Sequence, residues 1–331
     1  MLTTRLLVFV ALSGSLSAVS VCGGTAGSAW APGVSTEKGW IDANKAHVPY
    51  SADDAYAVGG GTDLSMRDKS MCWAAQSANM LQYWQNMYVS SGRTLPTGTP
   101  DGFVVGREDK TRRQYQIFEH FISNWTDMGG SCEYGIPWYL CGGFFSDYPT
   151  DVLWSECFGG MEKGGFFKDI YASPSALNWG DYCLYTYTQS NSAYTFTNVQ
   201  GFSSLLINCL EKQNAVVGLN VYLTNDKGAQ IKHALTVWGC DYDTAGMITK
   251  VYLTDSDDGV VGLRTFALED RNGNVYLSGY SDSSDGYARI QDFSMLSVNK
   301  FLVSVPEPSV FSLLAGLAGI FFAGTRRRRR G

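Results

Sequence analysis

Cys72 opens the stretch CWAAQSANMLQYW, at a position where a thiol can act as a nucleophile. Trp73, Met80 and Trp84 recur at helical spacing, which predicts a helix over residues 72–88 that begins at this cysteine. The N-terminus of a helix stabilises negative charge, and the thiolate is the reactive form of cysteine. A nucleophilic cysteine also needs a base within reach.

Histidine is the usual base for such a thiol, and the chain has three, His47, His120 and His233. His47 lies in a loop near the start of the body. His120 lies between apolar neighbours in a predicted helix over residues 109–125, which favours a packed side chain. His233 begins the strand-like stretch HALTVWGCDY. We therefore take His233 as the candidate base.

The strand that begins at His233 pairs with the stretch MITKVYLTD across the turn DTAG. If the turn centres on Thr244 and Ala245, His233 faces Asp255, and Asp257 shares their face. An imidazole oriented by a carboxylate completes a Cys-His-Asp arrangement. Two alternatives are a surface ion pair and a calcium loop in TDSDDG. The calcium loop fails the EF-hand template, because two ligand positions carry glycine and phenylalanine.

The eight cysteines divide by their surroundings. Cys209, in a predicted amphipathic helix over residues 201–213, and Cys240, in the hairpin strand, are expected to be buried. Four others lie in the irregular stretch 126–200 and are expected to form two disulfides in one of three pairings: Cys132, Cys141, Cys157 and Cys183. No C-x-x-C pair occurs and the histidines are scattered, so we predict no metal site and no cofactor.

The N-terminal residues 1–26 have the composition of a secretory signal peptide, with one arginine, an apolar run and small residues in that order. Cleavage after Ser20 or after Ala26 fits equally well. The alternative is a buried N-terminal helix. We therefore expect an exported protein.

The C-terminal residues 305–331 join a Pro-Glu-Pro turn to an uncharged stretch at 309–325 and the cluster Arg326 to Arg330. This order resembles the PEP-CTERM sorting signal. The resemblance implies an exosortase-type processing enzyme as a partner, a transient inner-membrane association, and release to the cell surface or beyond. A permanent C-terminal membrane anchor is the alternative.

Residues 27–304 are long enough for a substantial core, and the 37 glycines and 14% aromatic residues suggest a loop-rich extracellular fold. The formal charge of −6 includes the tail arginines, so the body is more acidic still and a nucleic-acid partner is excluded. Besides the elements above, we expect a strand at 215–223 and a polar hairpin around the turn at 271–274.

Five segments resemble, in order, the Mac family of papain-like cysteine proteases: GWIDANK, CWAAQSANMLQYW, VVGLNVY, HALTVWGCDYD and VYLTDSDD. The resemblance implies the α+β class and a papain-like fold, with the helix that carries the nucleophile packed on an antiparallel sheet. It also implies Cys72 as nucleophile, His233 as base, Asp255 as its orienting partner with Asp257 nearby, and Lys45 as the oxyanion cation.

These observations predict that residues 27–304 form an exported cysteine endopeptidase, with a protein or peptide as substrate and a thioester acyl-enzyme as intermediate. One alternative is a catalytically inactive or non-proteolytic binding protein of the cell surface or matrix on the same fold. Another is an enzyme that transfers or hydrolyses a different acyl group with the same residues. Nothing in the sequence indicates a particular substrate protein.

Overall fold

The computed structural model describes residues 25–45, 68–108, 113–143, 163–178, 184–188, 196–257 and 262–302. Residues 1–24 of the expected signal peptide, the expected tail with its span, and His47, Cys157 and Cys183 lie outside these ranges. Within the described part of the chain, no helix combines the length and apolar character needed to cross a membrane.

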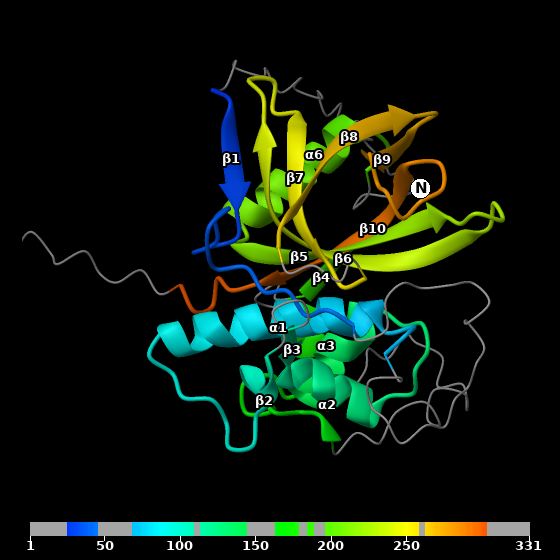
Figure 1. Cartoon of the computed structure of the whole chain (residues 1–331). Coiled ribbons are helices and arrows are strands. Elements are labelled where there is room, and N and C mark those ends of the chain that lie inside the picture. Colours follow the sequence, from blue (N-terminus) through cyan, green and yellow to red (C-terminus); the bar gives the residue numbers. More distant parts are fainter. Residues whose placement is uncertain are drawn as a thin grey trace, which may run out of the picture.

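Six antiparallel strands close into a barrel (Figure 1). They are β5 Ala215–Thr224, β6 Gln230–Tyr242, β7 Ile248–Asp255, β8 Arg264–Arg271, β9 Asn274–Ser278 and β10 Tyr287–Ser297. Each pairs with the next, and β10 pairs with β5 to complete the ring. The expected papain-like α+β fold, a helix packed on an antiparallel sheet, is therefore wrong. The sheet closes because β10, which the sequence analysis did not predict, joins β9 to β5.

Shorter strands extend this barrel and form a small separate sheet. β1 Gly27–Trp30 pairs with the end of β6, and β4 Leu184–Thr188 pairs with β10. In the part of the chain that the structure describes, β2 Phe103–Glu108 and β3 Arg113–Tyr115 pair with each other as a two-stranded sheet. The two hairpins and the strand at 215–223 were predicted from alternation and turn residues, and the structure confirms them.

The helices α1 Cys72–Ser90, α2 Gln116–Asn124 and α3 Cys132–Cys141 form a layer beside the barrel (Figure 1). Two further helices are α5 Ser175–Asn178 and α6 Val199–Glu211. The predicted positions of α1 and α6 are confirmed, whereas the helix expected over 109–125 is shorter, because residues 113–115 are in β3.

α3 lies in a stretch that we expected to be irregular, so that expectation is wrong for residues 132–141. The Ser131 side chain accepts a hydrogen bond from the backbone N–H of Glu133 and caps the start of the helix. Gly142, in the left-handed conformation, ends it. These caps stabilise a helix that contains Pro137 and has no clear apolar period in its sequence.

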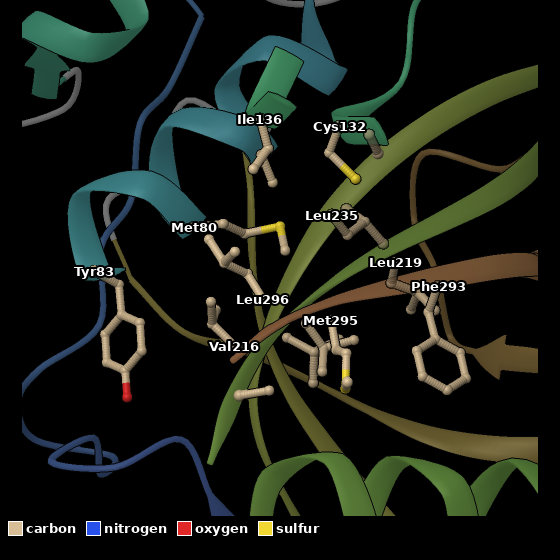
Figure 2. Close-up of a cluster of buried hydrophobic side chains, with 14 of the residues drawn as sticks. Met80, Tyr83, Cys132, Ile136, Val216, Leu219, Leu235, Phe293, Met295 and Leu296 are labelled. Atoms are coloured by element: carbon tan, nitrogen blue, oxygen red, sulfur yellow. The ribbon is translucent and has the colours of Figure 1, made fainter. Parts of the chain in front are cut away.

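The helical layer and the barrel share one hydrophobic core. Figure 2 shows Met80 of α1 and Ile136 of α3 pointing toward Leu235, Val216 and Leu296 of the barrel. Burial of each such side chain contributes about 1.5–3 kcal/mol to folding. This core fixes α1 against β5, β6 and β10.

A polar contact within this core sets the position of α1 along β5 and β6. The Gln76 side-chain amide donates hydrogen bonds to the carbonyl oxygens of Leu219, at 3.1 Å, and Leu235, at 2.7 Å. Gly218 makes room for it, because a Cβ atom there would lie 2.8 Å from the Gln76 Cδ. Since Gln76 is one turn beyond Cys72, the same contact places the thiol beside β6.

The described cysteines do not support the two expected disulfides. Cys132 is a free thiol, fully buried, and burial raises its pKa to about 12. Cys209 and Cys240 are buried, as predicted. Cys132 therefore stabilises the protein as a buried apolar side chain rather than through a covalent bond.

Candidate active site

Cys72 is the first residue of α1 and is partly exposed. Its neighbours are fixed on both sides by the loop between α2 and α3. The Ser70 backbone N–H donates to Asp127 at 2.6 Å, and the Trp73 indole N–H donates to the Met128 carbonyl at 2.9 Å. Met71, the N-cap, makes no side-chain hydrogen bond. The backbone N–H groups of Ala74 and Ala75 donate to the Met71 carbonyl oxygen, at 3.0 and 3.1 Å, and the N-terminal end of a helix favours an anion.

His233 lies on β6 beside this helix start, with 5% of its surface exposed. Its Nε2 is 2.7 Å from Asp255 Oδ1, and its side chain also hydrogen-bonds with Cys72. Because Asp255 occupies Nε2, Nδ1 is the nitrogen that remains for the thiol. Thiol, imidazole and carboxylate thus lie in one continuous chain of contacts.

The contact between His233 and Asp255 is present, although the predicted cross-strand pairing is wrong. Asp255 pairs with Leu235 in the ladder. The turn centres on Ala245, since the Asp243 N–H donates to the Met247 carbonyl at 2.9 Å, and this moves the register away from the expected one. Leu235 and His233 are two positions apart and share a face, so Asp255 still reaches the imidazole diagonally.

Lys45 is buried, with 1% of its surface exposed. Its Nζ lies 2.8 Å from Asp257 Oδ1 and donates to the Lys69 carbonyl at 2.6 Å. Burial alone lowers the pKa of Lys45, but the nearby Asp257 carboxylate and Cys72 thiolate outweigh it, so that the net pKa is raised. Lys45 is therefore a charged ammonium next to the thiol.

The segment that carries Lys45 is held between α1 and the end of β7. The Lys45 backbone N–H donates to the Ser256 carbonyl at 2.9 Å, and the Ala43 N–H donates to the Asn79 side chain at 2.7 Å. These bonds place Lys45 independently of the residues that separate it from Cys72 in the sequence.

Asp257 connects Lys45 with the His233–Asp255 pair. Besides Lys45, its Oδ2 lies 3.8 Å from His233 Nδ1, and its backbone N–H donates to Asp255 Oδ1 at 3.0 Å. The five predicted site residues thus come together at one point: Lys45, Cys72, His233, Asp255 and Asp257.

Two residues that the sequence analysis missed also contact Asp255. Its Oδ2 accepts hydrogen bonds from Arg264 Nη1, at 3.1 Å, and from the Tyr280 hydroxyl. Neither residue stands in a recognisable motif, and they come from β8 and from the segment after β9. Arg264 reaches the end of β7 because β8 pairs with β7, where Arg264 is opposite Leu253, and Tyr280 follows β9, which pairs with β8.

The charges of the site stabilise one another. Burial disfavours the imidazolium of His233, yet the Asp255 and Asp257 carboxylates raise its pKa well above the ordinary value. Burial likewise disfavours the carboxylate of Asp255, while His233 and the hydroxyl of Tyr280 lower its pKa below the usual range. The site therefore favours an imidazolium next to the thiol, as an ion-pair nucleophile requires.

His233, Asp255 and Asp257 also offer donor atoms within 4.8 Å of one another, close enough to hold a metal ion. However, the Lys45 ammonium and the Arg264 guanidinium already contact the two carboxylates, at 2.8 and 3.1 Å. These cations supply the positive charge that a metal would bring, so the donor set fits an ion-pair network better.

His120 contacts a different part of the molecule. Its Nε2 is 2.7 Å from the Lys163 carbonyl, and its ring stacks on Trp138. Burial lowers the pKa of His120. The predicted packed role is confirmed.

The geometry defines a protein with a thiol-imidazole-carboxylate site at the junction of a helix and a β-barrel. Residues 161–298, which include His233, Asp255 and Asp257, match the Mac 1 family model. The chain is also 25% identical over 248 residues to the IgM protease of Streptococcus suis (strain P1/7). That match covers 73% of this chain and 21% of the relative's length. Both similarities support the Mac family, which the sequence motifs indicated.

Proposed function

We propose that this chain is a cysteine peptidase of the Mac family, with Cys72 as nucleophile and His233 as general acid and base. The observation that carries the proposal is the pair of contacts made by one buried imidazole, to Asp255 at 2.7 Å and to the Cys72 side chain. A binding protein would have no need to bury these charges together, because each buried charge costs free energy unless it is paired.

In the proposed reaction, the Cys72 thiolate attacks a peptide carbonyl while His233 is an imidazolium. His233 then donates its proton to the leaving amine, and a thioester forms on the Cys72 sulfur. Next, water attacks the thioester with the neutral imidazole as base, which releases the acid product and restores the thiol. Asp255 keeps the imidazole in one orientation and stabilises its charged form.

The oxyanion formed in each step would be held by the backbone N–H of Cys72 and by Lys45. An ammonium has three N–H donors. Two of those of Lys45 point to Asp257 and to the Lys69 carbonyl in the described part of the chain. The third would donate to the oxyanion, where a positioned donor is worth a factor of about 10²–10³ in kcat.

The test is to incubate the purified protein with a peptide library derived from a proteome, alongside the Cys72→Ala and Cys132→Ala variants. We expect the wild type to generate new peptide ends and Cys72→Ala to generate none. Cys132→Ala is the matched control, because its thiol is fully buried. Equal cleavage by wild type and Cys72→Ala would refute the proposal.

We further propose that residues 27–304 act outside the cytoplasm, after removal of the signal peptide and exosortase-type processing of the tail. The support is the order of motifs at the two ends of the sequence. Cell fractionation with N- and C-terminal sequencing of the mature protein tests this. Retention of Arg326 to Arg330 in the envelope form would favour a permanent anchor instead.

A further inference from the structure

The carboxylate of Asp255 has partners on both oxygens, and among the described residues one of its four contacts is to the proposed base. Oδ1 accepts from His233 Nε2, at 2.7 Å, and from the backbone N–H of Asp257, at 3.0 Å. Oδ2 accepts from Arg264 Nη1 and from the Tyr280 hydroxyl. Since the carboxylate is fully buried, these four donors fix its plane and its rotation.

Arg264 is itself held in place rather than free to swing. Its guanidinium carbon lies 5.0 Å from the ring centre of Phe266 and 5.1 Å from that of Tyr280. Its Nη2 donates to the Ser281 hydroxyl at 3.1 Å, and Nη1 also lies 3.4 Å from Asp282. The side chain is 22% exposed, so it closes the solvent side of the Asp255 environment.

Tyr280 contacts the Asp255 carboxylate from the barrel side. It is fully buried and stacks on Phe266. Burial and the adjacent Asp255 carboxylate raise the pKa of Tyr280 well above its ordinary value. Its hydroxyl therefore stays protonated near neutral pH and can donate to Asp255.

We propose that Arg264 and Tyr280 are positioning residues that hold Oδ2 of Asp255, so that Oδ1 stays aimed at His233, and that they share the charge of Asp255 with the imidazole. The expected effect of these residues on catalysis rests on the proposed function. The charge sharing is a property of the folded protein and is measurable without substrate.

The sign of the effect follows from the groups that face Asp255. These are His233 from β6, Asp257 after β7, Arg264 from β8 and Tyr280 after β9, while Asp282 contacts Arg264 from its other side. Arg264 and His233 compete for one negative charge. When the positive charge of Arg264 is removed, the Asp255 carboxylate stabilises the His233 imidazolium more strongly. The pKa of His233 should therefore rise.

The experiment is an NMR titration of the imidazoles in the full chain carrying Cys72→Ala. The chain has only three histidines, so an additional His233→Gln variant assigns the signal. In Arg264→Met we expect the titration of His233 to move up by about half a pH unit or more. Tyr280→Phe, which loses only the hydroxyl, should move it in the same direction, and Arg264→Lys should restore it toward the parent value.

Arg271→Met is the matched control, because Arg271 also stacks on aromatic rings, 3.8 Å from the centre of Tyr287, but does not contact Asp255. In the chain with Cys72, Arg264→Met should lower kcat about tenfold with little change in KM. An unchanged His233 titration in both Arg264→Met and Tyr280→Phe, or an equal shift in Arg271→Met, overturns the proposal. A shifted titration in a chain without peptidase activity supports the positioning and refutes the proposed function.

Discussion

The buried ammonium of Lys45 and the partly exposed carboxylate of Asp257 form an ion pair, 2.8 Å long, between the segment before α1 and the turn after β7. This pair lies next to the thiol of Cys72 and crosses from the helical side of the molecule to the barrel. It explains why Lys45 is buried, although lysine is usually exposed.

Lys45→Met should lower kcat by roughly 10² or more, because a positioned oxyanion donor is lost. Steady-state kinetics with a cleaved peptide measures this. The control is Lys232→Met, since Lys232 is exposed on β6 next to His233 and tests a general effect of positive charge. Equal losses in the two variants would contradict a specific role for Lys45.

Cys72 should be alkylated faster than every other described cysteine. It is partly exposed and contacts His233, whereas Cys132, Cys209 and Cys240 have no exposed surface and Cys141 is buried with 6% exposed. Mass mapping after a brief iodoacetamide treatment near neutral pH gives the order of reaction. In His233→Ala the rate at Cys72 should fall while the buried thiols stay unmodified. Faster labelling of Cys209 or Cys240 than of Cys72 would be incompatible with the nucleophile assignment.

Asp255→Asn should destabilise the protein most in mildly acidic solution. The lowered pKa of Asp255 stabilises the fold above the ordinary carboxyl pKa, and this contribution is lost as the pH falls through the folded-state value. The raised pKa of His233 stabilises the fold below the ordinary imidazole pKa, and this contribution is lost as the pH rises through the folded-state value.

Both contributions are complete between about pH 4 and 6.5, where removal of one partner of a buried pair should cost roughly 3–5 kcal/mol. Urea unfolding of wild type and Asp255→Asn across the pH range measures the difference. The difference should shrink toward both ends. A difference that is constant with pH would rule out the ion pair as its source.

Gly218→Ala should lower both stability and peptidase activity. The new methyl group would lie 2.8 Å from the Gln76 Cδ and 2.8 Å from the Met80 sulfur, so α1 must shift on the barrel. Such overpacking costs about 1–3 kcal/mol. Gly201→Ala in α6 is the control, because its nearest heavy atom would be 3.5 Å away, and it should unfold at the same or a higher temperature. Thermal unfolding and peptide hydrolysis are the two measurements.

Chelating agents should leave peptide hydrolysis unchanged, because cations of the protein already contact both carboxylates of the site, at 2.8 Å from Lys45 and 3.1 Å from Arg264. Peptide hydrolysis is measured after treatment with EDTA and, separately, after treatment with iodoacetamide. The comparison distinguishes a metal-dependent peptidase from a cysteine peptidase. Loss with EDTA and recovery with a divalent metal would point to a metal enzyme.

Local patterns in the sequence were enough to predict the parts of the site that lie in regular elements. Helical spacing gave the start of α1 at Cys72, and alternation with a turn gave the hairpin that carries His233 and Asp255. The exact register depended on whether the turn centres on Ala245, which residue types at the turn do not decide.

Other features depend on contacts between distant segments and leave no local pattern. β10 pairs with both β9 and β5, so its role as the closing strand is visible only in three dimensions. Arg264 and Tyr280 meet Asp255 through the pairing of β8 with β7 and with β9, and no local motif marks that register. The caps of α3 at Ser131 and Gly142 were visible in the sequence, but the helix between them lacks an apolar period and was missed.

The shared core between α1 and the barrel has a consequence for how this protein loses activity. Cys72 belongs to the helical side and His233 to the barrel side, and Met80 and Leu235 are among the side chains that join the two (Figure 2). A slight separation of the two sides would part the thiol from its base while both retain their secondary structure. Peptidase activity should therefore depend on the contact between the helical layer and the barrel. It should disappear in mild denaturant before circular dichroism detects a loss of secondary structure.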